Sequence, residues 1–422
     1  MSPRPRLHRL SIAVLTVALV AAACGGGDGG STTAGPPDAA SIERAAVDPA
    51  APVEVLADGF TDAGFDLLRT QGTDDNVVFS PLSIGRALLM ARGAADEPTG
   101  AAIDATFALP DGIAAHEAWN ALDAAITSTN GAATALDDSP SPIVTLSGQI
   151  WPADTAEPDT EWIDLLLAQH GVVTETIDVS DAEGSRELIN NWVAGQTNQL
   201  IPELLPPGFI SDSTVLVLTD AVYFKAQWWD VFGKYGPVSG DFTRLDGSTV
   251  PTSYLQHLEL PGPRGVGDGY VGAEVGYLGD EYSMLVLVPD EGRFDEVRER
   301  LSTDLLAEVD ATFTEGPYEL RMPEWETTTA LDLLPWLTDA GIAPGAFPGI
   351  SPDAFLSGAV HGADITVDEV GTEAAAATAL GFDESAGAEA ELVVAAERPF
   401  LYLVRHVESG AVLFAGQVVD PS

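Results

Sequence analysis

The chain of 422 residues has few basic side chains: 18 Lys and Arg against 65 Asp and Glu, which gives a formal net charge of −47. This charge disfavours binding to nucleic acid or anionic lipid, so a partner steered by charge must be basic. The chain also has one cysteine, Cys24, which excludes an internal disulfide. A folded domain must therefore be stabilised by its core, and 45% hydrophobic residues allow a sizeable one.

Motifs for common enzyme chemistry are also missing. The sequence has no G-x-S-x-G and no P-loop, and His116-Glu117 is not followed by the second histidine of a zinc H-E-x-x-H site. Residues 267–272 satisfy G-x-G-x-x-G, but no clear strand precedes them and no helix pattern follows, so we reject a dinucleotide site. The six histidines show no ligand spacing. We predict a protein that is not an enzyme and has no cofactor or metal.

The N-terminal residues have the layout of a secretory signal. Three arginines precede the apolar run Leu10–Ala23, which is too short for a confident membrane span. The text AAAC, ending at Cys24, resembles a bacterial lipobox, although Ala21 stands where Leu, Val or Ile is more usual. An ordinary signal with an incidental cysteine is the alternative. We favour lipidation because the only cysteine lies where a signal would be removed, so residues 1–23 are predicted to be a signal peptide.

A tether is expected between the lipid and the folded domain. Residues 24–52 are rich in Gly, Ser, Thr, Pro and Ala, a composition that cannot bury enough apolar surface to fold. The folded domain is predicted to comprise residues 53–422. This organisation places a secreted domain at the outer face of a bacterial membrane, which it contacts only through the lipid on Cys24.

Hydrophobic periodicity and turn residues predict the order of helices and strands. Helices are expected at residues 53–70, 81–95, 98–136, 162–170, 185–201, 294–309 and 331–342, and Pro335 is expected to interrupt the last of them. Strands are expected at residues 77–79, 143–151, 172–179, 214–224, 283–290 and 318–325, followed by two C-terminal strands that turn at 408–410.

The segment 363–399 changes character halfway along its length. A strand-like pattern ends at Gly371, and the text TEAAAATA follows. Four consecutive alanines favour a helix by propensity, but no apolar periodicity supports a buried helix face. If the run lies in a sheet, alternate side chains share one face, and this small, uncharged face could enter a packed interior without burying a charge. Its members are Thr372, Ala374, Ala376 and Thr378.

The text VDEVGTEAAAAT in this segment resembles the hinge of the serpins, which usually reads close to Asp-Glu-x-Gly-Thr-Glu-Ala-Ala-Ala-Ala-Thr. Further segments resemble the family, in the family's order, from about Asn76 to Pro421. They are NVVFSPLSI, INNWVAGQTNQLI, KAQWWDVF, LRMPEW with GIAPGAF, and the C-terminal PFLYLVRHVESGAVLFAGQVVDPS. Two residues depart from the family pattern: Asp220 replaces the usual Asn and Ala226 the common Gly.

The resemblance implies an α+β serpin-like fold, with about eight to nine helices around a large central sheet A, smaller sheets B and C, and an exposed reactive-centre loop at about 371–391. It also implies an inhibitor that serine proteases consume as a substrate. The protease forms an acyl-enzyme with the loop, and the cleaved loop inserts into sheet A before deacylation. A non-inhibitory serpin-like binding or structural protein is the alternative. We expect a monomer.

The resemblance also assigns individual residues. The family's shutter and breach, where the central sheet opens, match Ser80, Ser83, Asn190, Trp228 and His361. Without the resemblance, these residues would be interpreted as a helix cap, a buried hydroxyl, a solvated amide, a core tryptophan and a neutral histidine. The hinge matches Glu369, Gly371, Thr372, Glu373, Ala374, Ala375, Ala376, Ala377 and Thr378.

Two ways of counting place the reactive bond differently. Counting forward from Glu369 at the family's spacing gives Ser385-Ala386, whereas counting back from Pro399-Phe400 gives about Ala388. We favour Ser385-Ala386 because insertion determines the length between hinge and bond, while the far side can vary as loops do.

The residues around this bond predict the class of protease. The sequence has no Lys or Arg between Gly371 and Glu397, so the acidic pocket of a trypsin-like protease finds no basic side chain. Small pockets suit Ser385, which predicts an elastase-like or subtilisin-like target. Glu384 and Phe382 leave a Glu-specific or a chymotrypsin-like protease as minor alternatives.

The predicted anchor can be tested by replacing its attachment residue. We expect Cys24→Ala to move the protein from the detergent phase to the aqueous phase in a partition experiment, because the apolar lipid would be lost. An unchanged membrane-bound fraction would show that Cys24 is not lipidated.

Overall fold

The computed structural model describes residues 43–232, 237–372 and 391–422. The helices in these ranges are α1 (Val53–Thr70), α2 (Pro81–Arg92), α3 (Glu97–Thr106), α4 (Ile113–Ser128), α5 (Thr160–His170), α6 (Ala182–Gln196), α7 (Phe294–Glu299), α8 (Thr303–Thr312) and α9 (Leu334–Asp339). The strands are β1 (Val77–Phe79), β2 (Ala133–Thr134), β3 (Pro140–Ser141), β4 (Ile143–Pro152), β5 (Val173–Thr174), β6 (Leu216–Gln227), β7 (Val238–Thr243), β8 (Thr249–Gly267), β9 (Tyr270–Gly276), β10 (Tyr282–Pro289), β11 (Thr314–Pro323), β12 (Trp325–Asp332), β13 (Val360–Val367), β14 (Gly371–Thr372), β15 (Val393–Ala395), β16 (Phe400–His406) and β17 (Val412–Val418).

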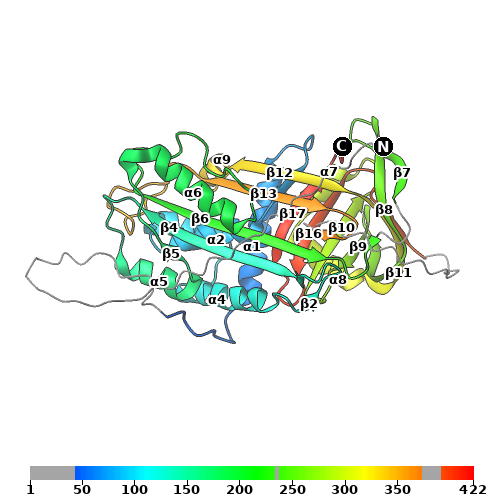
Figure 1. Ribbon diagram of the computed structural model, residues 1–422, viewed down its shortest axis with the longest axis horizontal. Coiled ribbons are helices and arrows are strands. Elements are labelled where there is room, and N and C mark those ends of the chain that lie inside the picture. The colour runs from blue at the N-terminus through cyan, green and yellow to red at the C-terminus, as the bar shows by residue number, and fades with distance from the viewer. Residues whose placement is uncertain (1–42, 233–236, 373–390) are drawn as a thin grey trace, which may run out of the picture. The chain divides into compact units, whose positions relative to one another are not determined.

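The central sheet has the strand order β12-β13-β14-β6-β4-β5. Figure 1 shows its long strands side by side, with α6 and α2 beside them. Residues of α6 and β4 share one apolar cluster, whereas α2 contributes to the main core. The long strand β8 links the two smaller sheets into one order, β1-β17-β16-β10-β9-β8-β11-β15, and β7 also pairs with β8. The predicted α+β architecture with a central sheet and smaller sheets is confirmed.

The core lies where continuous apolar runs form strands. Strands β10, β16 and β17 are buried at every position, as expected of runs without polar alternation. At the start of α2, the hydroxyl of Ser80 accepts a hydrogen bond from the backbone N–H of Ser83 at 3.1 Å, and Pro81 occupies the first turn. The sequence therefore correctly predicted this cap, both C-terminal strands and the strand β10.

Several predicted elements are broken by local backbone geometry. The helix expected at 98–136 is two helices, α3 and α4, separated at Gly112, which has a φ of 58°, and the hairpin β2–β3 follows α4. Helix α6 ends at Gln196 because Asn198 and Gln199 adopt φ values of 51° and 70°, which lie in the left-handed region. The prediction of one continuous helix over 98–136 was wrong, and the helix predicted over 185–201 ends earlier than expected.

Three other boundaries also differ from the prediction. The helix expected at 294–309 restarts at Ser302, whose hydroxyl caps α8 by accepting from the backbone N–H of Leu305. Pro335 lies in the first turn of α9 and does not interrupt it, because a first-turn proline loses no helical hydrogen bond. The strand expected at 172–179 is reduced to β5, with an isolated bridge at Ile177.

The last part of the segment predicted to be a tether, residues 24–52, contacts the folded domain. Arg44 donates hydrogen bonds to the side chains of Asn120 and Asp123 on α4, both at 2.7 Å. The backbone N–H of Ala45 donates to the carbonyl of Ala168 on α5 at 2.9 Å. Residues 44 and 45 are therefore held against the domain, because a charged side chain supplies the contacts that apolar burial does not.

In the described ranges, no helix combines the length and apolarity needed to cross a membrane.

Candidate functional site

The chain turns sharply into the central sheet after β13. The Asp368 carboxylate accepts hydrogen bonds from the backbone N–H groups of Val370 and Gly371, at 2.8 and 3.0 Å. The backbone N–H of Asp368 donates to the carbonyl of Gly371 at 3.0 Å. This turn reverses the chain, so that β14 lies between β13 and β6.

The two residues of β14 are fitted to this position. A Cβ on Gly371 would lie 2.1 Å from the carbonyl oxygen of Ala226, so no other residue fits there. Thr372 is 3% exposed and pairs with Ala226 on one side and Val367 on the other. Its hydroxyl is 2.6 Å from the hydroxyl of Tyr277. The first residue of the small-residue face therefore points into the protein, while the hinge residues 373–378 lie outside the described residues.

Trp228 holds the turn in place. It is fully buried, and its indole stacks on Tyr277 with centroids 4.4 Å apart and planes 14° from parallel. The indole N–H donates to the carbonyl of Asp368 at 2.9 Å, and its backbone N–H donates to the carbonyl of Val370 at 2.8 Å. Glu369 is held in the same way, because its carbonyl accepts from the backbone N–H of Phe232 at 2.9 Å. The resemblance of the segment KAQWWDVF to the serpins identified Trp228. No sequence signal distinguished Tyr277 from other core tyrosines.

Carboxylates gather beside this turn. Burial raises the pKa of Asp368, and the N–H groups of Val370 and Gly371 partly oppose the shift. Burial also raises the pKa of Glu324, with a further contribution from the charge of Glu369. Among the described residues, no three His, Cys, Asp or Glu side chains are arranged to hold a metal ion.

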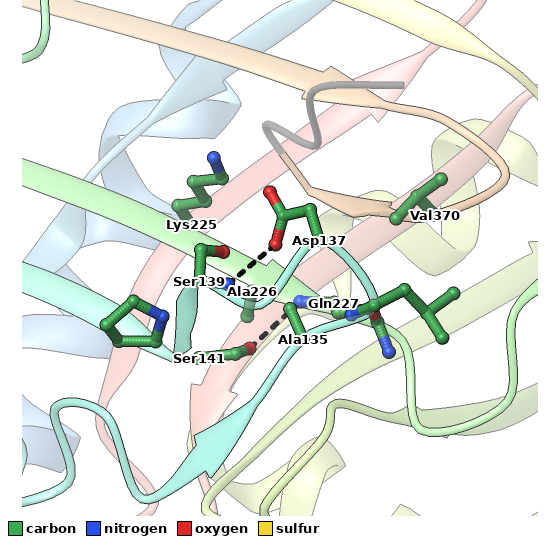
Figure 2. A pocket seen from close by; sticks show the side chains of 10 residues that line it. Ala135, Asp137, Ser139, Ser141, Lys225, Ala226, Gln227 and Val370 are labelled. Atoms are coloured by element: carbon green, nitrogen blue, oxygen red, sulfur yellow. Dashed lines mark hydrogen bonds between the residues drawn. The ribbon is translucent and has the colours of Figure 1, made fainter. Parts of the chain in front are cut away.

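The hairpin β2–β3 covers the end of β6 next to the turn. A cavity of about 20 Å³ lies between them, lined by hairpin residues, the end of β6 and Val370, whose side chains are drawn in Figure 2. The side-chain oxygen of Gln227 accepts from the backbone N–H of Leu136 at 2.7 Å, and its backbone N–H donates to the hydroxyl of Ser141 at 3.2 Å. The hairpin therefore attaches to the strand that β14 must pair with.

A second cluster lies further down the same strands. The neutral Nε2 of His361 accepts a hydrogen bond from the backbone N–H of Ser80 at 3.0 Å. Burial lowers the pKa of His361 from its usual 6.5 to about 4, so the ring stays unprotonated and can accept. Ser80, Ser83, Asp220 and His361 line one small cavity. The structure therefore brings together three of the residues assigned to the shutter.

Asn190 is not part of this cluster. Its side-chain oxygen accepts from the backbone N–H groups of Leu204 and Leu205, at 3.0 and 2.8 Å, and its amide donates to the carbonyl of Leu205 at 3.0 Å. Asn190 thus holds the segment after α6. Asp220, and not Asn190, lies with Ser83 and His361 around the small cavity, so the shutter role assigned to Asn190 stays a prediction of the family resemblance.

Asp220 forms a buried ion pair that the sequence analysis missed. Its Oδ1 is 2.7 Å from Nη1 of Arg86 on α2, and the two side chains are 2% and 1% exposed. Burial raises the pKa of Asp220 to about 6, while the charge of Arg86 and the nearby hydroxyl of Ser83 oppose the shift. Arg86 also donates to the carbonyl of His170 at 2.8 Å and lies 4.6 Å from the ring centre of Trp119. The replacement of the usual Asn by Asp was the available signal, since a buried carboxylate needs a partner.

Strands β6 and β13 face each other beyond the short strand β14. We call the boundary between these two strands, from Thr372 to their first residues, the seam. Among the described residues, β14 joins β6 and β13, and no ladder joins them directly. Three cavities follow the seam: one of about 10 Å³ below Thr372, one of about 10 Å³ at the shutter, and one of about 400 Å³ at its base. The central sheet therefore has packing gaps along one line, directly below the hinge.

Comparison with known proteins identifies the class. A family model described as "Serpin (serine protease inhibitor)" matches residues 58–421. Over 385 residues the chain is 32% identical to a sequence named serpin-Z6C from Oryza sativa subsp. japonica, covering 83% of this chain and 92% of the relative. Over 398 residues it is 29% identical to the leukocyte elastase inhibitor of Homo sapiens, covering 87% and 100%. The chain belongs to the serpin family.

A solved structure shows the same fold. The thermophilic serpin tengpin in its native state superposes with a TM-score of 0.77 at 19% sequence identity, covering 90% of this chain and 96% of that one. At this identity the likeness concerns the fold alone, and it agrees with the predicted serpin architecture.

The buried ion pair leads to a prediction about stability. Asp220→Asn should lower the free energy of unfolding by about 3–5 kcal/mol, because Arg86 would remain buried without its counter-charge. Adding Arg86→Met should recover much of the loss. Urea unfolding of both variants measures these effects. Asp104→Asn is the control, since its pair with Arg92 is about one-third exposed and should contribute at most about 1 kcal/mol. Equal losses at both sites would contradict the special role of Asp220.

The shutter histidine leads to a prediction about pH. The folded protein keeps His361 neutral down to about pH 4, whereas the unfolded chain takes up a proton near pH 6.5. Stability linked to His361 is therefore present above pH 6.5 and is lost as pH falls towards 4, by roughly 3 kcal/mol. Measured by urea unfolding between pH 4 and 7, His361→Gln should flatten this dependence relative to the wild type.

His116→Gln provides a matched control. Burial lowers the pKa of His116 to about 4 as well, but this residue contacts His170 and does not line the seam. Both variants should flatten the pH dependence of unfolding, and only the variant at 361 should alter a process that opens the seam. An unchanged pH profile in His361→Gln would show that this ring does not titrate as inferred.

Proposed function

We propose that this serpin inhibits serine proteases as a consumed substrate. The family is mostly composed of protease inhibitors rather than enzymes. The observation that carries the proposal is the two-residue strand β14, which lies between β6 and β13 at the top of a seam that no ladder closes in the described residues. Cleavage of the loop after β14 would free its N-terminal part to continue into this seam.

The energy for inhibition comes from completing the sheet. A strand inserted along the seam would pair with β6 on one side and β13 on the other, as Thr372 already does. Each new backbone hydrogen bond contributes about 0.5–1.5 kcal/mol, so a dozen of them give on the order of 10 kcal/mol. While the protease is still bound to Ser385 as an acyl-enzyme, this insertion carries it away from the top of the sheet and distorts its active site before water can release it.

The proposed target is a protease that accepts small residues. The reactive bond Ser385-Ala386 lies outside the described residues, so the choice rests on the sequence around it. That sequence lacks Lys and Arg from Gly371 to Glu397 and offers Ser and Ala, which suit an elastase-like or subtilisin-like pocket. A relative that shares 29% identity with this chain is named leukocyte elastase inhibitor, in agreement with this choice.

We further propose that the inhibitor acts as a monomer outside a bacterial cell, anchored by a lipid on Cys24. The apolar run before Cys24 and the polar tract after it support this location. Between Cys24 and the first contact at Arg44, the chain would serve as the tether.

The hinge can be tested with two variants on opposite faces. Ala376→Glu would place a carboxylate on the inward face, and burying it would cost several kcal/mol without a partner. Insertion should slow relative to deacylation, so this variant should be cleaved without trapping the protease. Ala377→Glu, on the outward face, is the matched control and should still inhibit. Equal covalent complex from both variants, quantified on denaturing gels, would argue against insertion in this register.

The reactive bond can be located directly. Incubation with an elastase-like or subtilisin-like protease should give a complex that survives denaturant, and intact-mass analysis should find a released peptide that begins at or within three residues of Ala386. Trypsin should not be inhibited, because its pocket requires a basic residue. A peptide that starts outside 384–389 would overturn this assignment, and cleavage without any complex would support a non-inhibitory serpin.

A further inference from the structure

Two buried side chains of α4 hold the guanidinium group of Arg44. Its Nε donates to the side-chain oxygen of Asn120 and its Nη2 to the carboxylate of Asp123, both at 2.7 Å. The side-chain amide of Asn120 donates in turn to the carbonyl of Ala45 at 3.0 Å. Asn120 is 2% exposed and Asp123 9% exposed, whereas the side chain of Arg44 is 35% exposed. The acceptors therefore belong to the folded domain, and the guanidinium group reaches them from outside.

The end of α5 is shaped to receive the same two residues, which we call the strap. The backbone N–H of Ala45 donates to the carbonyl of Ala168 at 2.9 Å. A Cβ on Gly171, the residue after α5, would lie 2.0 Å from Nη1 of Arg44, and Gly171 has a φ of 61°. A side chain at 171 would therefore be strained and would also block Arg44. The strap thus fastens α4 to the end of α5.

The last residue of α5, His170, connects this junction to α2. Its Nε2 is 2.8 Å from Nδ1 of His116 on α4, and its ring lies nearly parallel to that of Trp119, with centroids 6.0 Å apart. The carbonyl of His170 accepts a hydrogen bond from Nη2 of Arg86 on α2 at 2.8 Å. The position of Arg86 therefore depends on where α5 ends.

Arg86 carries the connection into the shutter. Its Nη1 is 2.7 Å from Oδ1 of Asp220, which lines one small cavity with Ser83 and His361. Contacts among buried groups thus lead from the strap through the end of α5 to β6. Polar contacts away from water are strong and sensitive to geometry, so a shift at the strap can reach the shutter.

The charges of the same residues point in the same direction. Burial raises the pKa of Asp220 to about 6, and the carboxylate of Asp123 adds to the rise. Arg44, which forms an ion pair with Asp123 at 2.7 Å, offsets the charge of that carboxylate. Without Arg44, the pKa of Asp220 should rise further, because a nearby uncompensated negative charge disfavours ionisation. The ion pair of Asp220 with Arg86 would then be weaker.

We propose that Asn120 and Asp123 form a guanidinium-binding site, and that its occupation by Arg44 holds the shutter closed. The segment that precedes Arg44 is then more than a passive link, because displacing the strap loosens the contact between His361 and Ser80. This inference concerns the uncut protein. It goes beyond the proposed protease inhibition and requires neither that activity nor the lipid on Cys24.

The experiment measures amide hydrogen exchange of the full chain. The N–H of Ser80 reports on the shutter, because it donates to Nε2 of His361. Arg44→Ala should speed exchange at Ser80 by about 5-fold or more, the lower end of couplings between distant sites. Arg244→Ala is the matched control. It removes an ion pair with Asp420 whose side chains are 30% and 35% exposed, and it should leave exchange at Ser80 unchanged.

Chemical rescue tests the site itself. Methylguanidinium added to Arg44→Ala should restore slow exchange at Ser80, because its planar fork can donate to Asn120 and Asp123 as Arg44 does. Methylammonium at the same concentration carries the charge without the fork and should not restore it. Arg44→Lys is the corresponding variant, and its exchange at Ser80 should stay faster than in wild type.

Other outcomes would overturn the proposal. Faster exchange at Ala45 with unchanged exchange at Ser80 would show that the strap is a local contact only. Equal rescue by both compounds would show that the site does not select a guanidinium group. In the Asp220→Asn background, Arg44→Ala should add little at Ser80, and an undiminished effect would show that the coupling does not pass through the ion pair. None of these measurements involves a protease, so the proposed function stands or fails separately.

Discussion

The structure depends on one incomplete sheet. Strands β6 and β13 both pair with β14, yet β14 has only two residues, and in the described residues no ladder joins its neighbours below it. Backbone N–H and C=O groups away from water are costly when they lack partners, and the line of cavities along the seam adds lost packing contacts. Under the proposed mechanism, the fold would gain free energy from one more strand, and the cleaved loop would supply it, because the hinge begins where the seam begins.

A few specific contacts hold the two sides of the seam in place. At its top, Trp228 binds the carbonyls of the turn at 368–370 and stacks on Tyr277, which contacts Thr372. Lower down, His361 joins β13 to the start of α2 through the backbone of Ser80. These contacts are few and specific, so they stabilise the incomplete sheet without closing the seam with a ladder.

The pair Arg86–Asp220 shows how a departure from the family pattern is accommodated. A carboxylate at the shutter would be costly alone, and α2 supplies an arginine at 2.7 Å. The compensation lies 134 positions away in sequence, so the substitution at 220 could be noticed in the sequence but its partner could not be identified. The hydrogen bonds of Asn190 to Leu204 and Leu205 likewise could not be identified from the sequence, because the partners lie 14 and 15 positions away.

The sequence by itself determined the features that depend on neighbouring residues: the capped start of α2 at Ser80 and the fully buried strands β10, β16 and β17. It also determined the family, because ordered motifs along most of the chain leave few alternatives. Tertiary structure decided the ion pair at Asp220 and the cavity at the base of the seam. These features arise from contacts between segments far apart in the chain, and local propensity carries no information about which distant side chain will fill or leave a space.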